Sequence, residues 1–239
     1  MARGAPNAAE MKKALRLHAR RDKAHILQGF FKTGPGQYGE GDRFLGVVVP
    51  DIRRVAGKYR DAPESAVVSL LASEYHEERL LALLILVQQF FRGNEQRKKR
   101  IYTLYLKNVR CINNWDLVDL SAPNIMGAWL ADKSRKRLHQ FARSKNVWKR
   151  RIAILSTFAF IRNNNFSDTL TISKTLLRDE HDLIHKAVGW MLREVGKRSP
   201  AAEESFLKQH YRTMPRTMLR YAVERFPEAK RKRYLEGKV

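Results

Sequence analysis

Five segments of similar pattern recur along the chain, and they begin at Arg79, Trp115, Arg151, Lys186 and Thr217. Their starts are separated by 36, 36, 35 and 31 residues, which leaves room for a second helix between each successive pair. A helix-pair repeat of this length is typical of stacked TPR, HEAT and armadillo arrays. Because the TPR consensus is absent, the spacing favours HEAT-like repeats, which curve and present an extended concave binding face.

Most of the remaining sequence also has helical patterning, and no strong strand alternation competes with it. Proline and glycine residues separate this pattern into discrete helices. The predicted helices cover residues 7–32, 50–60, 63–73, 75–92, 95–109, 114–131, 133–144, 147–163, 167–177, 181–196, 200–211, 214–226 and 228–237. We therefore predict an all-α fold, a HEAT-like helical repeat solenoid that forms a single domain over residues 1–239 and has a basic concave face.

The stretch Lys32–Arg43 departs from the helical pattern because it is rich in glycine. Gly34, Gly36 and Gly39 match the G-x-G-x-x-G pattern of dinucleotide-binding loops. That fingerprint has to follow a strand and open a helix, whereas this stretch follows a predicted helix and contains a proline, so we reject a dinucleotide site. Residues 33–43 are either a flexible connector or a loop whose glycines permit close approach to a phosphate backbone.

The chain carries 47 Lys and Arg residues against 24 Asp and Glu, a formal net charge of +23. Such a charge repels itself in a compact domain, so a polyanionic partner is expected. Arginine outnumbers lysine by 28 to 19, which favours phosphate because the guanidinium group binds it through two parallel hydrogen bonds. Nucleic acid is the leading partner, and a solvated basic surface is the alternative. An acidic membrane surface is a third possible partner. The sequence argues against it, because it contains no strongly basic helix with a bulky apolar face.

Cys111 is the only cysteine, which excludes a disulfide framework and a cysteine-rich zinc site. The longest apolar run, Leu80–Val87, is far shorter than the roughly 20 residues that a membrane span needs. The N-terminus has no apolar core like that of a secretion signal. We expect a cytoplasmic, nucleoid-associated monomer without membrane contact.

The repeat register places polar and aromatic side chains in a column on one face of successive helices. Residues four apart share a helix face, so each repeat contributes its first residue and the residue four positions later. The first position is charged or polar in four of the five repeats, which is typical of a groove rather than a core. The register therefore predicts one cluster, formed by Trp115, Asp119, Arg151, Lys186 and Trp190.

Each member of this cluster also has a purely structural interpretation. A single tryptophan is more often a core residue than a ligand contact, Arg151 ends a short basic run, and Asp119 could pair with Arg151. Trp129 and Trp148 fall outside the register, and we interpret them as packing residues.

A carboxylate between aromatic faces suits a substrate that carries or develops positive charge. Asp119 would stabilise an oxocarbenium-like sugar and orient a water molecule, while Arg151 and Lys186 would hold flanking phosphates. Cleavage of a glycosidic bond usually needs a second carboxyl group as an acid. That need disappears when the leaving base is already cationic, as in an N3- or N7-alkylated purine of DNA.

Five strings of the sequence point to a known family. The most specific is Lys-Ala-Val-Gly-Trp-Met-Leu-Arg-Glu at 186–194, and the next is Trp-Asp-Leu-Val-Asp at 115–119. The matching segments span most of the chain: Phe44–Asp51, Trp115–Asp119, Val147–Leu155, Ile184–Glu194 and Met214–Ala222. In these segments the chain resembles the AlkD family of DNA alkylation repair enzymes, the HEAT-like-repeat alkylpurine DNA glycosylases.

The resemblance implies a monofunctional DNA glycosylase that removes N3-methyladenine and N7-methylguanine from duplex DNA without base flipping, metal or cofactor. Carried over residue by residue, it implies four catalytic-site residues: the aspartate Asp119, the tryptophans Trp115 and Trp190, and the arginine Arg151. Arg193 corresponds to a further DNA-contacting arginine. With the other basic side chains along the repeats, the predicted DNA contacts are Arg79, Lys149, Arg150, Lys186, Arg193 and Arg220.

The sequence departs from the family at two places. Val48 and Val49 occupy positions where a relative carries a polar pair, which argues against the minor-groove contacts implied there. The glycine-rich loop is also longer than in some relatives. The alternative to a glycosylase is a non-catalytic HEAT-repeat scaffold that binds DNA or RNA, but a scaffold has no need of Asp119 on a phosphate-binding face. A protein-binding solenoid would have a mixed-charge groove rather than this excess of cations.

Overall fold

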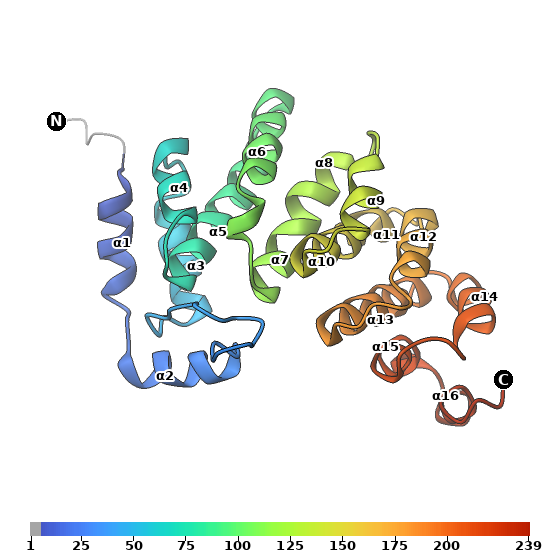
Figure 1. Cartoon of the computed structure of the whole chain (residues 1–239). Helices are drawn as coiled ribbons and strands as arrows, with labels where there is room; N and C mark the ends of the chain where they lie inside the picture. Colours follow the sequence, from blue (N-terminus) through green and yellow to red (C-terminus); the bar gives the residue numbers. More distant parts are fainter. Residues whose placement is uncertain (1–5) are drawn as a thin grey trace. The chain divides into compact units, whose positions relative to one another are not determined.

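The computed structural model describes residues 6–239 as helices joined by turns and one longer loop (Figure 1). No strand forms in this part of the chain, and a single isolated bridge joins Arg43 to Tyr75. The predicted all-α fold of helical repeats is therefore confirmed. The chain divides into two compact units, Met1–Ser121 and Ala122–Val239, called unit 1 and unit 2. One continuous HEAT-like domain stays a prediction.

Unit 1 consists of helices that begin and end close to the predicted bounds, with one exception. They are α1 (Ala8–Arg16), α2 (Arg21–Phe30), α3 (Val49–Lys58), α4 (Glu64–Leu71), α5 (His76–Arg92), α6 (Glu95–Lys107) and α7 (Trp115–Ser121), with a 3₁₀ turn at Val109–Cys111. The centre of the unit is α5, which packs against α3, α4, α6 and α7. Its residues Leu80–Leu86 are all buried because these neighbours surround it. A helix surrounded in this way can carry apolar side chains on every face.

The exception is the helix predicted over 7–32, which is wrong because the chain forms two helices there. The break is a tertiary effect: the Arg20 amide donates to the carbonyl of Leu45 at 3.1 Å instead of continuing the helical ladder. Gly46, with φ at +80°, lets the loop before α3 pass this close. A Cβ at Gly46 would lie 2.0 Å from the Arg20 carbonyl oxygen, so only glycine fits there.

Unit 2 begins with a π-helical segment, Ala122–Gly127, which lies within the range of the predicted helix 114–131 and contains Pro123. A π turn accommodates a proline that lacks the amide hydrogen an α-helix requires. The α-helices are α8 (Ala128–Leu130), α9 (Lys136–Ala142), α10 (Val147–Ser156), α11 (Phe158–Arg162), α12 (Ser167–Thr175), α13 (Asp182–Gly196), α14 (Pro200–His210), α15 (Arg216–Ala222) and α16 (Glu228–Leu235), with a 3₁₀ turn at Val223–Arg225.

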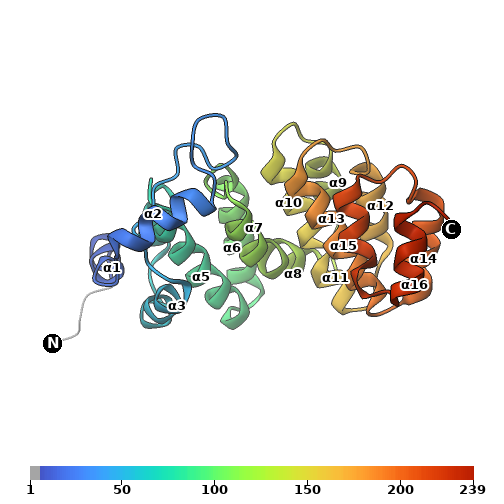
Figure 2. The same ribbon diagram turned by 90° about the horizontal axis from the view of Figure 1, so that it is seen from below.

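Within unit 2, α13 packs against α10, α14 and α15, so the helices that carry the repeat register are neighbours (Figure 2). The predicted helix 147–163 is interrupted at Thr157, whose hydroxyl donates to the carbonyl of Ile154 at 2.7 Å. Trp129 and Trp148 are buried, as their interpretation as packing residues requires. Among the helices of residues 6–239, none combines the length and apolar character that crossing a bilayer demands.

Candidate functional site

Helix α7 carries two of the predicted catalytic residues, Trp115 in its first turn and Asp119 one turn later. Asn114 precedes the helix, and its Oδ1 accepts a hydrogen bond from the Trp115 amide at 2.8 Å. Both predicted side chains are half-buried. Burial, and the nearby charge of Asp119, raise the pKa of the Tyr105 hydroxyl. The Asp119 carboxylate therefore lies at the margin of the core of unit 1.

The indole of Trp115 ends a row of aromatic rings. It stacks on Phe31 with 5.2 Å between centroids and 16° between planes, and Phe31 in turn stacks on Phe44 at 4.9 Å. Phe30, which is 61% exposed, meets the Trp115 ring edge-on at 5.9 Å. Aromatic faces attract cationic groups by about 0.5–2 kcal/mol each. This row therefore offers a surface that suits a positively charged base.

Next to the aromatic row, His76 of α5 bridges two carboxylates. Its Nδ1 lies 3.0 Å from Asp42 Oδ2 and its Nε2 lies 2.8 Å from Asp116 Oδ2, while the Phe44 ring stacks on the imidazole at 4.7 Å. Burial alone would lower the pKa of His76, but Asp116 and Asp42 outweigh it and raise that pKa to about 9. The imidazole is therefore cationic at neutral pH and ties α5 to the first turn of α7.

Asp42 fixes the end of the glycine-rich loop. Its buried carboxylate pairs with Arg79, accepts a hydrogen bond from Asn114 Nδ2 at 2.9 Å, and contacts His76. Burial acts to raise the pKa of Asp42, but His76 and Arg79 lower it below the ordinary value. The predicted DNA contact Arg79 is itself buried, and its Nη1 donates to the Ser73 carbonyl at 3.0 Å. In this structure Arg79 thus helps to hold the loop against α5 and α7.

An apolar groove of about 450 Å³ opens beside the aromatic row, between α2 and α3. Val48 and Val49 line it and are partly exposed. The polar side chains among its lining residues are Lys23, His76, Glu77 and Asp116. The two valines therefore present apolar surface where the resemblance implied polar contacts.

Unit 2 carries the other two predicted catalytic residues. Arg151 of α10 is buried, and its Nη1 donates to the carbonyl of Leu183 at the start of α13. Trp190 of α13 is half-buried; its Nε1 donates to Glu194 Oε1 at 3.1 Å, and its ring lies 6.1 Å from Phe158. Both side chains are therefore fixed by contacts within unit 2.

The neighbouring helices α13 and α15 bring together three residues that the repeat register aligns. Lys186, Thr217 and Tyr221 line one pocket of about 540 Å³, together with the exposed Arg220. Lys186 also pairs with Asp182 at 2.7 Å, one turn earlier on α13. Lys186 and Thr217, which the spacing aligns, thus line the same pocket within this unit. The predicted cluster draws Trp115 and Asp119 from unit 1, and its assembly with residues of unit 2 stays a prediction.

The remaining predicted DNA contacts are held by local partners. Arg150 pairs with Asp179 at 2.6 Å, and the ammonium group of Lys149 lies 5.7 Å from the centre of the Phe141 ring. Arg193 pairs with Glu224. These partners keep the cations ordered on unit 2.

The sequence model of the DNA alkylation repair enzyme family matches residues 11–226 of the chain. This chain belongs to that family. A solved structure described as a predicted DNA alkylation repair enzyme from Enterococcus faecalis has the same fold, with a TM-score of 0.69 at 17% sequence identity. The superposition covers 88% of this chain and 98% of that one. No curated protein sequence matches the chain.

Membership of the DNA alkylation repair enzyme family gives the chain a role in repairing alkylated DNA. Within residues 6–239, no three His, Cys, Asp or Glu side chains gather as a metal ion would require. Reasoning from the sequence missed Asp42, His76 and the ring of Phe31. One signal was present: four polar residues, 76–79, open a helix whose next eight residues, 80–87, are all apolar. A buried first turn of that kind needs buried partners, and Asp42 is one of them.

Proposed function

We propose that this member of the DNA alkylation repair enzyme family is a monofunctional DNA glycosylase. Its substrates are cationic alkylated purines in duplex DNA, N3-methyladenine and N7-methylguanine. It hydrolyses their N-glycosidic bond without flipping the base into a pocket and without a cofactor. The observation that supports this proposal best is the half-buried carboxylate of Asp119, one helical turn from the aromatic row that ends at Trp115.

The proposed reaction needs only one carboxylate. As the C1′–N bond breaks, its electron pair moves to the cationic base, which leaves as a neutral molecule, and the sugar takes on oxocarbenium character. The Asp119 carboxylate stabilises this positive charge and orients the water whose oxygen bonds to C1′ and whose proton is released. A protonating acid is unnecessary because the leaving group carries no negative charge.

The aromatic faces of Trp115 and Trp190 contact the cationic nucleotide in this proposal, and Arg151 contacts its phosphate. The other proposed phosphate contacts lie on unit 2: Lys149, Arg150, Lys186, Arg193 and Arg220. The acidic partners of Arg193 and Lys186 are displaced by the more highly charged phosphate backbone. Arg79 is left out of this set because its side chain is buried and bound to Asp42.

Release of free base from methylated duplex DNA tests the proposal. We expect wild type to release N3-methyladenine or N7-methylguanine, and Asp119→Asn to do so at least about 100-fold more slowly, as loss of a preorganised electrostatic group does elsewhere. Binding of undamaged DNA by Asp119→Asn should be retained, because the substitution removes a negative charge. Asp132→Asn is the matched control, since Asp132 is an exposed acid on unit 2.

Two results would count against the proposal. If wild type binds DNA tightly but releases no base, the protein is the non-catalytic DNA-binding scaffold considered as the alternative. Equal loss of DNA binding and base release in Asp119→Asn would give Asp119 a structural role.

A further inference from the structure

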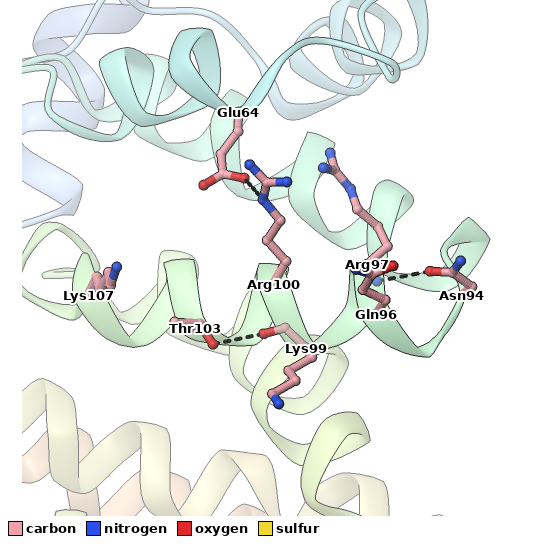
Figure 3. Close-up of a pocket in the computed structure, with 8 residues that line it drawn as sticks. All are labelled: Glu64, Asn94, Gln96, Arg97, Lys99, Arg100, Thr103 and Lys107. Carbon is pink, nitrogen blue, oxygen red and sulfur yellow. Dashed lines mark hydrogen bonds and ion pairs between the residues drawn. The ribbon is translucent and has the colours of Figure 1, made fainter.

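Helix α6 forms one wall of a second basic surface, a groove of about 640 Å³ beside α4 (Figure 3). Four cations line it, and only one acid does. The lining residues are Glu64, Asn94, Gln96, Arg97, Lys99, Arg100, Thr103 and Lys107. We call this surface the α6 groove. Its other side chains are amides and a hydroxyl, which donate hydrogen bonds without adding charge.

The cations follow the helical period along α6. Arg100 and Lys107 lie seven residues apart, which is two turns, so they project from the same face about 10 Å apart along the axis. Ile101, Leu104 and Tyr105 are buried along the flank of α6 next to these two cations. The exposed part of the helix therefore carries Arg100 and Lys107 in line, with Lys99 to the other side.

Two of the arginines are held in place by other helices. Buried Gln89 of α5 donates to the carbonyls of Arg60 and Ala62, both at 2.9 Å, and its Oε1 accepts a hydrogen bond from Arg97 at 2.5 Å. Arg100 donates through Nε to Glu64 of α4 at 2.6 Å, which leaves the donors of its two Nη groups for another acceptor. Figure 3 shows both arginine side chains rising from α6 on the side of α4.

The α6 groove is separate from the candidate site of unit 1. Helix α5 begins close to Arg79 and the site residues, and it ends at Arg92, two residues before Asn94 of the groove. Thirteen helical residues separate Arg79 from Arg92, about 20 Å along the axis. A single alkylated nucleotide at Trp115 does not account for cations at the far end of this helix.

We infer that the α6 groove binds the phosphodiester backbone of a second segment of duplex DNA. Guanidinium groups with free donors match phosphate oxygens, and a row of cations along a helix follows a regularly charged polymer better than a small anion. The strongly positive net charge of the chain supports the same class of partner. The inference does not depend on glycosylase activity.

The test counts the duplexes bound by one chain. Short undamaged duplexes of about one helical turn are labelled with either a donor or an acceptor dye. Sedimentation gives the number bound per chain, and energy transfer reports duplexes bridged by one protein. We expect wild type to bind two duplexes. The triple variant Lys99→Gln, Arg100→Gln, Lys107→Gln should bind one, and its bridging signal should fall at least about tenfold because up to three phosphate contacts are lost.

A matched control removes the same charge elsewhere, through Arg231→Gln, Lys232→Gln and Arg233→Gln at three exposed positions of α16. It should keep both duplexes and the bridging signal. Base release by the α6 triple variant should equal that of wild type. One duplex per wild-type chain would overturn the inference, as would equal loss of bridging in the α16 control. Loss of binding to the first duplex in the α6 variant would make the groove part of the primary site.

Discussion

The two units of the molecule bury carboxylates in opposite ways. In unit 1, Glu77 accepts hydrogen bonds from the amides of Leu45, Gly46 and Val47, at 2.8 to 3.2 Å. In unit 2, Glu203 of α14 is 3% exposed, and its Oε1 has no hydrogen-bond partner among residues 6–239. Burial raises the pKa of Glu203 to about 8, although Lys230 and Arg193 act in the opposite direction.

The comparison distinguishes Glu77, a buried carboxylate whose hydrogen bonds stabilise the fold, from Glu203, a buried carboxyl group whose desolvation is not compensated. The partners of Glu77 lie about thirty residues away in the chain, so its charge holds the loop before α3 against α5. A buried carboxylate without enough donors keeps much of its desolvation penalty, and Glu203 is in that position. The candidate site of unit 1 therefore contains buried charges with hydrogen-bond partners, whereas the end of unit 2 contains a buried carboxyl group that stays largely protonated at neutral pH.

The largest expected loss of stability comes from disrupting the hydrogen bonds that the Glu77 carboxylate accepts. Glu77→Gln places an amide NH₂ group against backbone N–H donors and removes the charge that attracts them. We expect it to lower the free energy of unfolding by about 3–5 kcal/mol, the usual cost of breaking a buried charged network. Urea denaturation at pH 7 measures this.

The matched control is Glu74→Gln, an exposed neighbour paired with Arg43, which should change stability by less than about 1 kcal/mol. A small effect of Glu77→Gln would show that the loop is held mainly by its apolar contacts with α5.

The next effect concerns His76 and has a defined pH dependence. Its folded pKa of about 9 lies above the ordinary value of 6.5, so its contribution is complete below pH 6.5 and is lost as the pH rises through 9. The shift corresponds to about 3 kcal/mol, because one pKa unit is about 1.4 kcal/mol. From pH 6 to 9.5, the unfolding free energy of wild type relative to that of His76→Gln should fall by that order, because the separate titration of Glu203 is common to both proteins.

His76→Gln should flatten this part of the profile, because glutamine does not titrate. Trp115 fluorescence should change over the same pH range in wild type, since His76 holds the first turn of α7 through Asp116. An unchanged slope in His76→Gln would assign the pH dependence to another group.

Much of the fold could be predicted from the sequence because helix ends carry local signals. Asn146 and Ser199 precede α10 and α14, and each accepts a hydrogen bond from the first turn of its helix. The break between α1 and α2 could not be predicted in this way. Its cause is the hydrogen bond from Arg20 to Leu45, a contact between residues 25 positions apart.

The candidate site was predictable where it follows the helical repeat. Spacing alone aligned Lys186 with Thr217, and the two residues line one pocket. The network around Asp42 was not predictable, because its residues come from a loop and two helices with no shared period. For the same reason the burial of Arg79 was missed: the register fixes the face of a helix but not what a loop places against it.

A smaller effect is expected for Glu203, and here the substitution should stabilise the protein rather than destabilise it. The folded pKa of Glu203, about 8, lies above its ordinary 4.5, so wild type loses stability as the pH rises from 4.5 to 8. Glu203→Gln removes the charge and keeps the shape. It should stabilise the protein by about 1–3 kcal/mol at pH 8.5 and have little effect at pH 4.5. Thermal unfolding at the two pH values checks this, and destabilisation at pH 8.5 would show that Lys230 or Arg193 needs the carboxylate.

The smallest expected effect is on the salt dependence of DNA binding, and it depends on how the positive charge is distributed between the two units. Unit 1 holds 21 Lys and Arg against 13 Asp and Glu, whereas unit 2 holds 26 against 11. If unit 2 supplies the phosphate contacts, Arg220→Gln should reduce the slope of log binding constant against log salt by about 0.9. Base release at saturating DNA should stay unchanged. Arg225→Gln, another exposed arginine of unit 2, is the control. Equal slopes for the two variants would mean that net charge, rather than the pocket beside Lys186, governs binding to DNA.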